Sequence, residues 1–302
     1  MKRKIRTVLM LAFLLIGVGV LLYPDIMNWQ EDRRHIGFIQ EYNADVALIE
    51  SAVIEYELER ARIFNNSITD IRVNDPWGQG ANDTFGTQEY YNLLNFSESR
   101  VMGRIEIPKI DVDLPIFHGS SSAVLDRGVG HMPHTSLPIG GYGNHSILTA
   151  HTGLINARLF TNLVDLPVGE IFVITVATNR IAYRVFERDT VLPHQIEGLK
   201  IDENRDLVTL VTCYPYGVNT HRLLVFGERI PYYEGMLDEI ESINRAINIR
   251  HLAIITIITF VTLVSIFRQI KVAKKKKAKN LELAHELEYK EMFGDQNATG
   301  KN

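Results

Sequence analysis

The apolar positions of the chain form different patterns in successive regions. Two uninterrupted apolar runs, at 7–23 and 252–267, lie near its two ends. Between 31 and 64 the apolar residues recur in steps of three and four, which predicts one long helix with a single buried stripe. That stripe comprises Ile39, Tyr42, Val46, Ile49, Val53 and Tyr56.

Periodicity is lost between residues 65 and 100, where Asn, Asp, Gly and Ser are frequent. The pattern predicts a loop of about 35 residues, far longer than an ordinary connection between elements. Loops of that length are usually functional or disordered, so we expect this one to do more than join two elements.

From residue 101 onward, short runs rich in Val, Ile, Thr and Tyr alternate with Pro, Gly and Asn clusters, which predicts β-strands. The expected strands are 101–107, 146–150, 171–176, 181–186, 207–212 and 222–229. Many short strands with long connecting loops are typical of a closed or nearly closed β-barrel, so the predicted fold class is mainly β.

The two apolar runs predict membrane segments. Four basic residues precede the run at 7–23, which is either a cleaved signal peptide or a retained signal anchor. The residues after it make a poor cleavage site, which favours the anchor. The run at 252–267 is followed by a basic cluster at 268–279; a buried core helix is the alternative for it. The positive-inside rule places both ends in the cytoplasm and 24–250 outside the cell.

Composition and charge agree with an exported globular region. The chain has 302 residues, 46% hydrophobic and 23% charged, which excludes a disordered polar chain and a disulfide-stapled mini-protein. The formal charge of -4 is unevenly distributed, because both ends are basic and 24–250 is acidic. A nucleic-acid binder would need a basic central region, so no nucleic-acid partner is expected.

The chain contains one cysteine, Cys213, at the end of the expected strand 207–212. A lone thiol is either a small buried hydrophobe or a reactive group. The turn-rich segment 214–221 leads into the next strand, so Cys213 and Arg222 should face each other across a hairpin. A guanidinium there could donate hydrogen bonds to an oxyanion that forms beside the thiol.

Several of the ten histidines are candidates for the base that such a thiol needs. His151 emerges at the end of the expected strand 146–150. His221 is nearer to the cysteine in sequence, but strand alternation turns it away from the face that Arg222 uses. His131 and His134 form an H-x-x-H pair in a Gly/Pro-rich loop without acidic or cysteine ligands, so no metal site is expected.

The pentapeptide Thr-Leu-Val-Thr-Cys at 209–213 resembles the signature of the sortases, membrane-anchored cysteine transpeptidases of Gram-positive bacteria. His151 and Arg222 match the histidine and arginine of that family in order and spacing. The resemblance covers about 101–230 and implies an eight-stranded sortase-type barrel. It implies Cys213 as nucleophile, His151 as general acid/base and Arg222 as the oxyanion and substrate stabiliser. It implies no cofactor.

Further features resemble the pilus-building class C of the family. The segment 216–225 is similar to a loop and strand of that class, and Asp75-Pro76-Trp77 matches its lid motif. The resemblance implies that Asp75 pairs with Arg222 and that the Trp77 ring covers Cys213. An ion pair at a partly exposed site is worth only about 0–1 kcal/mol, so the lid is expected to open readily.

The predicted organisation places a β-barrel between helical and membrane-associated parts. Its segments are an N-terminal anchor (1–23), an exported helical region (24–64), a lid-containing loop (65–100), the catalytic barrel (101–232), a juxtamembrane helical segment (233–250), a C-terminal membrane helix (251–268) and a basic cytoplasmic tail (269–302). The expected location is therefore the cell membrane, with the barrel extracellular.

The class C resemblance implies an enzyme that cleaves an LPxTG-like sorting signal and transfers it to a pilin lysine, which polymerises pili. A housekeeping sortase that attaches proteins to the peptidoglycan precursor is the alternative within the family. A non-catalytic membrane-tethered adhesion module and a secreted cysteine protease are the alternatives outside it.

Overall fold

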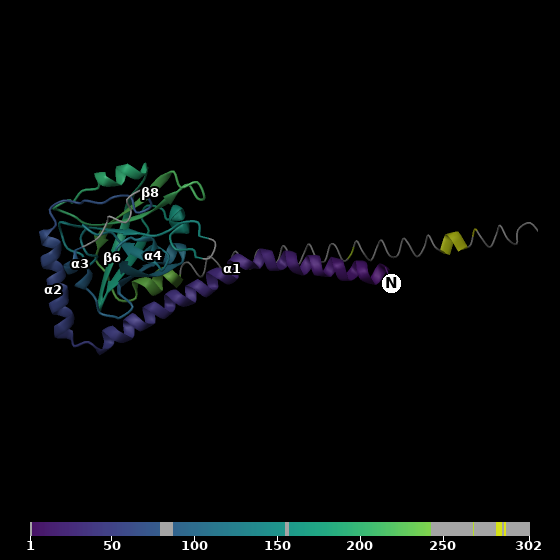
Figure 1. The fold of residues 1–302 in the computed structure, drawn as a ribbon, viewed down its shortest axis with the longest axis horizontal. Coiled ribbons are helices and arrows are strands. Elements are labelled where there is room, and N and C mark those ends of the chain that lie inside the picture. The colour runs from purple at the N-terminus through teal and green to yellow at the C-terminus, as the bar shows by residue number, and fades with distance from the viewer. Residues whose placement is uncertain are drawn as a thin grey trace, which may run out of the picture. The chain divides into compact units, whose positions relative to one another are not determined.

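Eight strands close into a β-barrel (Figure 1). Strands that are adjacent in the barrel are not always consecutive in the sequence. The computed structural model describes residues 2–78, 87–154 and 157–242, together with 268, 282–285 and 287. The strands are β1 (Val101–Ile107), β2 (Val112–His118), β3 (Val129–His131), β4 (Asn144–Thr149), β5 (Ile171–Val176), β6 (Asn179–Val191), β7 (Asp206–Tyr214) and β8 (His221–Ile230). Their order around the barrel is β1-β2-β3-β4-β7-β8-β6-β5. The predicted mainly β, barrel-type fold is confirmed.

Two of the strand pairs are parallel, β2 with β3 and β4 with β7, and the other pairs are antiparallel. The pairing of β4 with β7 matters most for the site, because it joins segments that are far apart in the sequence. Since the two strands run in the same direction, the residues that follow β4 emerge at the same end of the barrel as the end of β7.

Two strands, β2 and β3, lack the local sequence pattern that predicts a strand. β2 contains Pro115, which interrupts a strand pattern because proline lacks a backbone donor. β3 has only three residues, with Gly130 at its centre. A Cβ atom at Gly130 would lie 2.5 Å from the carbonyl oxygen of Gly119, so the close approach of the backbones requires glycine there.

The helical region consists of two helices instead of the single one expected. They are α1 (Lys2–Leu48) and α2 (Ser51–Ser67), and Figure 1 shows α2 and the C-terminal part of α1 beside the barrel. Glu50 has an extended backbone, and this break changes the phase of the apolar stripe. Tyr42 and Val46 are buried as expected, whereas Val53 and Tyr56 are exposed. The face that α2 buries instead comprises Ile54, Leu58, Ala61 and Asn65.

Polar contacts fix both helices to the barrel. The Tyr42 hydroxyl donates to the carbonyl of Met102 (3.1 Å) and accepts from the backbone N–H of Ala177 (2.8 Å). The Asn65 side chain exchanges two hydrogen bonds with the backbone of Leu137, at 3.1 and 2.7 Å. These bonds satisfy buried polar groups that would otherwise destabilise the fold.

The expected loop at 65–100 is not wholly irregular. It contains a short helix, α3 (Gln88–Asn92), which begins after Thr87, whose side chain accepts from the N–H of Tyr90. Tyr90 is buried in the barrel core, where its hydroxyl bonds with His131 Nδ1 (2.9 Å). This half of the segment is therefore part of the packed domain, and the lid motif belongs to the other half.

Among the described residues, no helix combines the length and the apolar composition needed to cross a membrane. The expected C-terminal span at 252–267 lies outside the described residues, as does 243–250 of the expected juxtamembrane segment. Residues 236–242 of that segment are helical. The two flanking membrane helices are thus not confirmed.

Candidate active site

Cys213 and Arg222 are direct partners across the β7–β8 hairpin. The antiparallel register pairs Cys213 with Arg222 and Tyr214 with His221. Directly paired residues extend their side chains to the same face of a sheet, which brings thiol and guanidinium together as expected. Both side chains are buried. The ring of His221 instead interacts with the hydroxyl of Thr220 (2.9 Å).

His151 reaches the same end of the barrel through the parallel pairing of β4 with β7. The register ends with Thr149 opposite Val211, and the Thr212 hydroxyl donates to the carbonyl of Ala150 (2.8 Å). His151 therefore follows directly on a backbone that is fixed beside the residue preceding Cys213. The three residues proposed from sequence converge on one end of the barrel.

Arg222 is held by a bidentate ion pair with Asp75. Its Nε lies 2.6 Å from Oδ1 and its Nη2 lies 2.7 Å from Oδ2. Its Nη1 donates to the carbonyls of Asn219 (2.9 Å) and His221 (2.8 Å). The Arg222 and Asp75 side chains are only 5% and 10% exposed, so the pair is more buried than the sequence suggested. Since the separation of a buried pair costs more than that of a surface pair, the segment that carries Asp75 is held more firmly than expected for a lid.

Trp77 contacts both His151 and Arg222. Its indole N–H donates to Nδ1 of His151 (3.0 Å), and the guanidinium of Arg222 lies 5.0 Å from its ring centroid. Contact of the lid with Arg222 and His151 is thus present, while the expected cover of the Trp77 ring over Cys213 stays a prediction. Because an indole N–H can only donate, Nδ1 must be unprotonated. A neutral His151 then carries its proton on Nε2.

The closed site disfavours both charged forms that thiol chemistry requires. Burial raises the pKa of Cys213 to about 11; Arg222 acts against this rise, and Asp75 adds to it. Burial lowers the pKa of His151, and the carboxylate of Asp126 partly offsets that effect. At neutral pH the structure therefore holds a neutral thiol beside a neutral imidazole, a resting arrangement.

Sequence reasoning missed Asp126, whose Oδ1 lies 3.7 Å from Nε2 of His151. It follows α4 (Ser122–Leu125) and precedes β3. A single exposed carboxylate after a four-residue helix carries no recognisable signal in the sequence. Its place beside His151 is visible only once the strands are assembled.

The H-x-x-H pair does not form part of this site. The ring of His131 is buried in the core, where Nδ1 interacts with the Tyr90 hydroxyl (2.9 Å) and Nε2 with the carbonyl of Ser136 (2.8 Å). Burial lowers the pKa of His131 to about 3. Its polar atoms serve the packing of α3 and β3 against each other.

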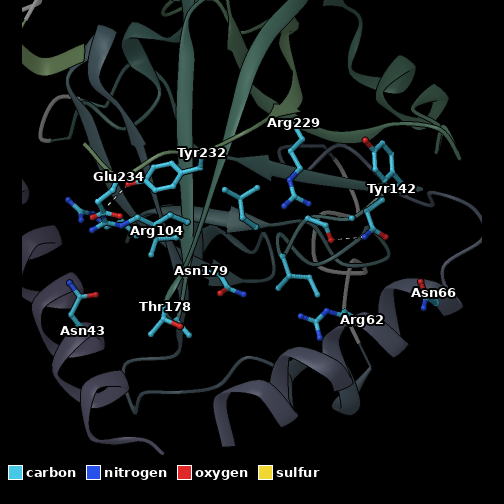
Figure 2. Close-up of a pocket in the computed structure, with 18 residues that line it drawn as sticks. Asn43, Arg62, Asn66, Arg104, Tyr142, Thr178, Asn179, Arg229, Tyr232 and Glu234 are labelled. Atoms are coloured by element: carbon cyan, nitrogen blue, oxygen red, sulfur yellow. Dashed lines mark hydrogen bonds and ion pairs between the residues drawn. The ribbon is translucent and has the colours of Figure 1, made fainter. Parts of the chain in front are cut away.

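A large open basin lies at the opposite end of the barrel. It has a volume of about 970 Å³, and Figure 2 shows its side chains, among them Arg62, Tyr142 and Arg229. It lies where β4 begins and β8 ends, whereas the candidate catalytic residues lie where β4 ends and β8 begins. This basin is thus separate from the thiol.

A closed barrel with a strand-end cysteine paired to an arginine, and a histidine just after the neighbouring strand, is the arrangement of a cysteine transpeptidase. The chain belongs to the sortase family: residues 105–230 match the model of the sortase domain.

Solved structures and curated proteins similar to this chain are sortases too. Sortase C-1 of Streptococcus pneumoniae is 39% identical with a TM-score of 0.60, over 65% of this chain and 98% of that one. Sortase C1 of Streptococcus agalactiae is 41% identical with a TM-score of 0.59, over 66% and 96%. Sortase A of Streptococcus agalactiae serotype III is 30% identical over 131 residues, 42% of this chain. That match spans 52% of the length of this sortase A.

Proposed function

We propose that this chain is a membrane-anchored sortase of the pilus-building class C. In this proposal it cleaves an LPxTG-like sorting signal and transfers it to a lysine amine of a pilin subunit. The observation that carries the proposal is the register that pairs Cys213 with Arg222 beside His151, under a segment whose Asp75 occupies the guanidinium. Similarity to sortases C-1 of two streptococci supports the class.

Acylation begins when the Cys213 thiolate attacks the threonine carbonyl carbon of the sorting signal. The carbonyl π electrons move to oxygen, and Arg222 donates hydrogen bonds to the resulting oxyanion. As the intermediate collapses, the threonine–glycine C–N bond breaks. The His151 imidazolium protonates the departing glycine amine. The products are a thioester on Cys213 and a neutral His151.

Transfer runs the same chemistry in reverse order with a different amine. The lysine amine of a pilin attacks the thioester carbonyl, neutral His151 takes its proton, and the sulfur leaves as thiolate. An isopeptide bond joins the two subunits, and the thiolate–imidazolium pair is restored. Repeated cycles would join pilins into a fibre.

The lid has a defined part in this cycle. Asp75 occupies the donors that the oxyanion needs, and Trp77 occupies the nitrogen through which His151 would exchange its proton. Substrate must therefore displace both contacts together. This arrangement makes the closed lid a gate that protects the site between turnovers.

The location is part of the proposal. Basic clusters beside both apolar runs favour cytoplasmic ends with the acidic barrel outside the cell. There the enzyme would meet secreted substrates that the membrane retains by their own C-terminal segments.

Cell-wall anchoring is the second candidate, favoured by the similarity to sortase A of Streptococcus agalactiae serotype III and of Listeria monocytogenes. Competition between amines separates the two. The full chain in detergent micelles would receive an LPxTG peptide together with equal amounts of a pilin and a wall-peptide amine, and mass spectrometry would identify the products. An isopeptide with the pilin lysine supports pilus assembly, and exclusive use of the wall amine contradicts it. Loss of all products in Cys213→Ala shows that the thiol carries the reaction.

A further inference from the structure

The side of His151 that faces away from the lid has its own charged neighbour. Trp77 occupies Nδ1, so the proton of the neutral ring is on Nε2. Oδ1 of Asp126 lies 3.7 Å from that nitrogen. The two ring nitrogens are therefore used differently: one by a removable lid residue, the other by a carboxylate of the barrel domain.

The backbone that carries Asp126 is fixed independently of the lid. The Asp126 N–H donates to the carbonyl of Ser122 (2.9 Å), and its own carbonyl accepts from Nη2 of Arg34 in α1 (3.1 Å). The next residue, Arg127, has its guanidinium 4.9 Å from the ring centroid of Phe38 in α1 and 4.5 Å from that of Phe117 in β2. When the lid opens, Asp126 therefore stays beside His151.

We propose that Asp126 is a positioning residue for His151, which keeps one proton on Nε2 and stabilises the imidazolium so that Nδ1 exchanges the catalytic proton. This inference rests on the proposed transpeptidase function. The other charged or titratable groups at the site are Cys213 on β7 and the Arg222–Asp75 pair. Once Asp75 leaves with the lid, Arg222 remains as a cation, and Asp126 is the carboxylate that stays to balance a positive His151.

The expected effect is modest because the Asp126 side chain is 66% exposed. Exposed ion pairs contribute about 0.2–1 kcal/mol, which corresponds to a change of about 1.4- to 5-fold in a protonation equilibrium. Loss of the carboxylate should lower the pKa of His151 by the corresponding fraction of a pH unit.

Because the pKa of Cys213 lies above that of His151, a lower pKa of His151 should alter the pH profile of kcat/KM in a characteristic way. The pKa of Cys213 is raised and that of His151 is lowered, so the thiolate–imidazolium form is a minor population between them. Its fraction falls in proportion when the pKa of His151 falls. The plateau of kcat/KM should then drop by the same factor by which the acid limb moves to lower pH, while the alkaline limb stays in place.

The test compares Asp126→Asn and Asp126→Glu with a matched control, Asp45→Asn. The control removes one carboxylate from the last turn of α1. Each change is made in the full chain and again with Asp75→Ala and Trp77→Ala, so that the lid does not limit the profile. Transfer of an LPxTG peptide to an amine gives kcat/KM against pH. NMR titration of the His151 ring in a Cys213→Ala background gives its pKa without any need for turnover.

We expect Asp126→Asn to lower the His151 pKa and the plateau together, Asp126→Glu to restore most of both, and Asp45→Asn to match the parent. An unchanged His151 pKa in Asp126→Asn overturns the inference, whether or not activity falls. Failure of the proposed function itself would be recognised separately, because the parent chain would then transfer no LPxTG peptide to an amine, while the NMR titration of His151 would still give its pKa.

Discussion

Each end of the barrel has an arginine–aspartate ion pair, and the two pairs connect different parts of the molecule. At one end Arg222 pairs with Asp75 of the lid, beside Cys213 and His151. At the other end Arg229 pairs with buried Asp206 (3.2 Å), which also accepts from the N–H of Gly141 (2.5 Å). The first pair joins the segment between α2 and α3 to β8, whereas the second joins β7 and β8 within the barrel wall.

The comparison shows that the open basin and the candidate catalytic residues lie at different ends of the barrel. The basin at the Arg229 end is an open space of about 970 Å³, yet its arginines already have partners. These pairs are Arg62 with Glu55 and Glu59, Arg104 with Asp113, Arg180 with Glu234, and Arg229 with Asp206. The Cys213 end is covered, and its thiol and imidazole have shifted pKa values. Shifted pKa values alone do not separate the two ends, because burial also raises the pKa of Asp206. The Cys213 end differs in holding a thiol paired with a guanidinium.

The largest effect should come from Cys213→Ala, which removes the nucleophile. We expect transfer to disappear while the fold persists, because the loss of one sulfur at a strand end leaves a small cavity. Mass spectrometry of the products and a circular dichroism melt measure the two properties. Measurable transfer would contradict the catalytic role, and a melting temperature far below that of the parent would favour a purely structural thiol.

The pH dependence of stability should be the next largest effect, and it arises from three buried histidines on α1, β2 and β3. Burial lowers the pKa of His35 and His118 to about 4 and that of His131 to about 3. The unfolded chain takes up these protons below pH 6.5, whereas the folded chain does not. Stability is therefore full above about pH 6.5 and falls towards pH 4, by up to about 1.4 kcal/mol per histidine and pH unit.

Urea unfolding at pH 7.5 and 5.5 measures this slope. His35→Leu should flatten it by the share of one histidine, and His194→Leu, at an exposed position, should leave it unchanged. Equal slopes in the parent and in His35→Leu would show that His35 is protonated in the folded state.

Arginine substitutions at the two ends test the comparison directly. Arg222→Ala and His151→Ala should each lower kcat/KM by at least about 10²-fold, the scale for loss of an oxyanion donor or an acid/base group. Neither loss should add to that of Cys213→Ala, because the residues act as one unit. Arg229→Ala should lower the free energy of unfolding, since it leaves Asp206 buried without its cation, and should change kcat/KM less than twofold.

His221→Ala is the matched histidine control, because its ring lies against Thr220. A requirement for His221 and not for His151 would reassign the base. Equal losses of activity from Arg222→Ala and Arg229→Ala would remove the functional distinction between the two ends.

The smallest effect should come from opening the lid. Asp75→Ala with Trp77→Ala removes a negative charge and exposes the thiol, so the pKa of Cys213 should fall from about 11 towards its ordinary value. Labelling of the thiol at pH 8 should accelerate at least about tenfold, because the thiolate is the reactive form. Hydrolysis of the sorting signal should rise as well. Asp70→Ala, at an exposed position in the same segment, is the control, and a double variant that labels at the parental rate would refute the lid.

Much of the barrel could be predicted from sequence because its strands carry local signals. The β-branched runs of β5 and β7 predict strands directly. In contrast, Pro115 interrupts the strand pattern of β2, and β3 is too short, at three residues, to show one. The break at Glu50 was missed because the apolar period continues across it.

The contacts of the candidate site likewise fall into those that local sequence predicts and those that depend on the assembled fold. The Cys213–Arg222 contact follows from one hairpin and could be argued from strand geometry alone. The Asp75–Arg222 contact was expected only from resemblance to a family, since no local rule connects a loop to a distant strand. Asp126 had neither kind of signal, because its position depends on the parallel pairing of β4 with β7 and on the packing of α1.

The burial of Cys213 also bears on oxidative damage. Oxidants convert the thiolate, not the thiol, to sulfenic and then to irreversible sulfinic and sulfonic acids. A rise of the pKa from 9.0 to about 11 leaves about a hundredfold fewer thiolates at neutral pH than an ordinary cysteine would present. The described chain has no second cysteine to rescue a sulfenic acid as a disulfide. The burial that raises the pKa of Cys213 therefore also extends the chemical lifetime of a thiol that the protein cannot regenerate by itself.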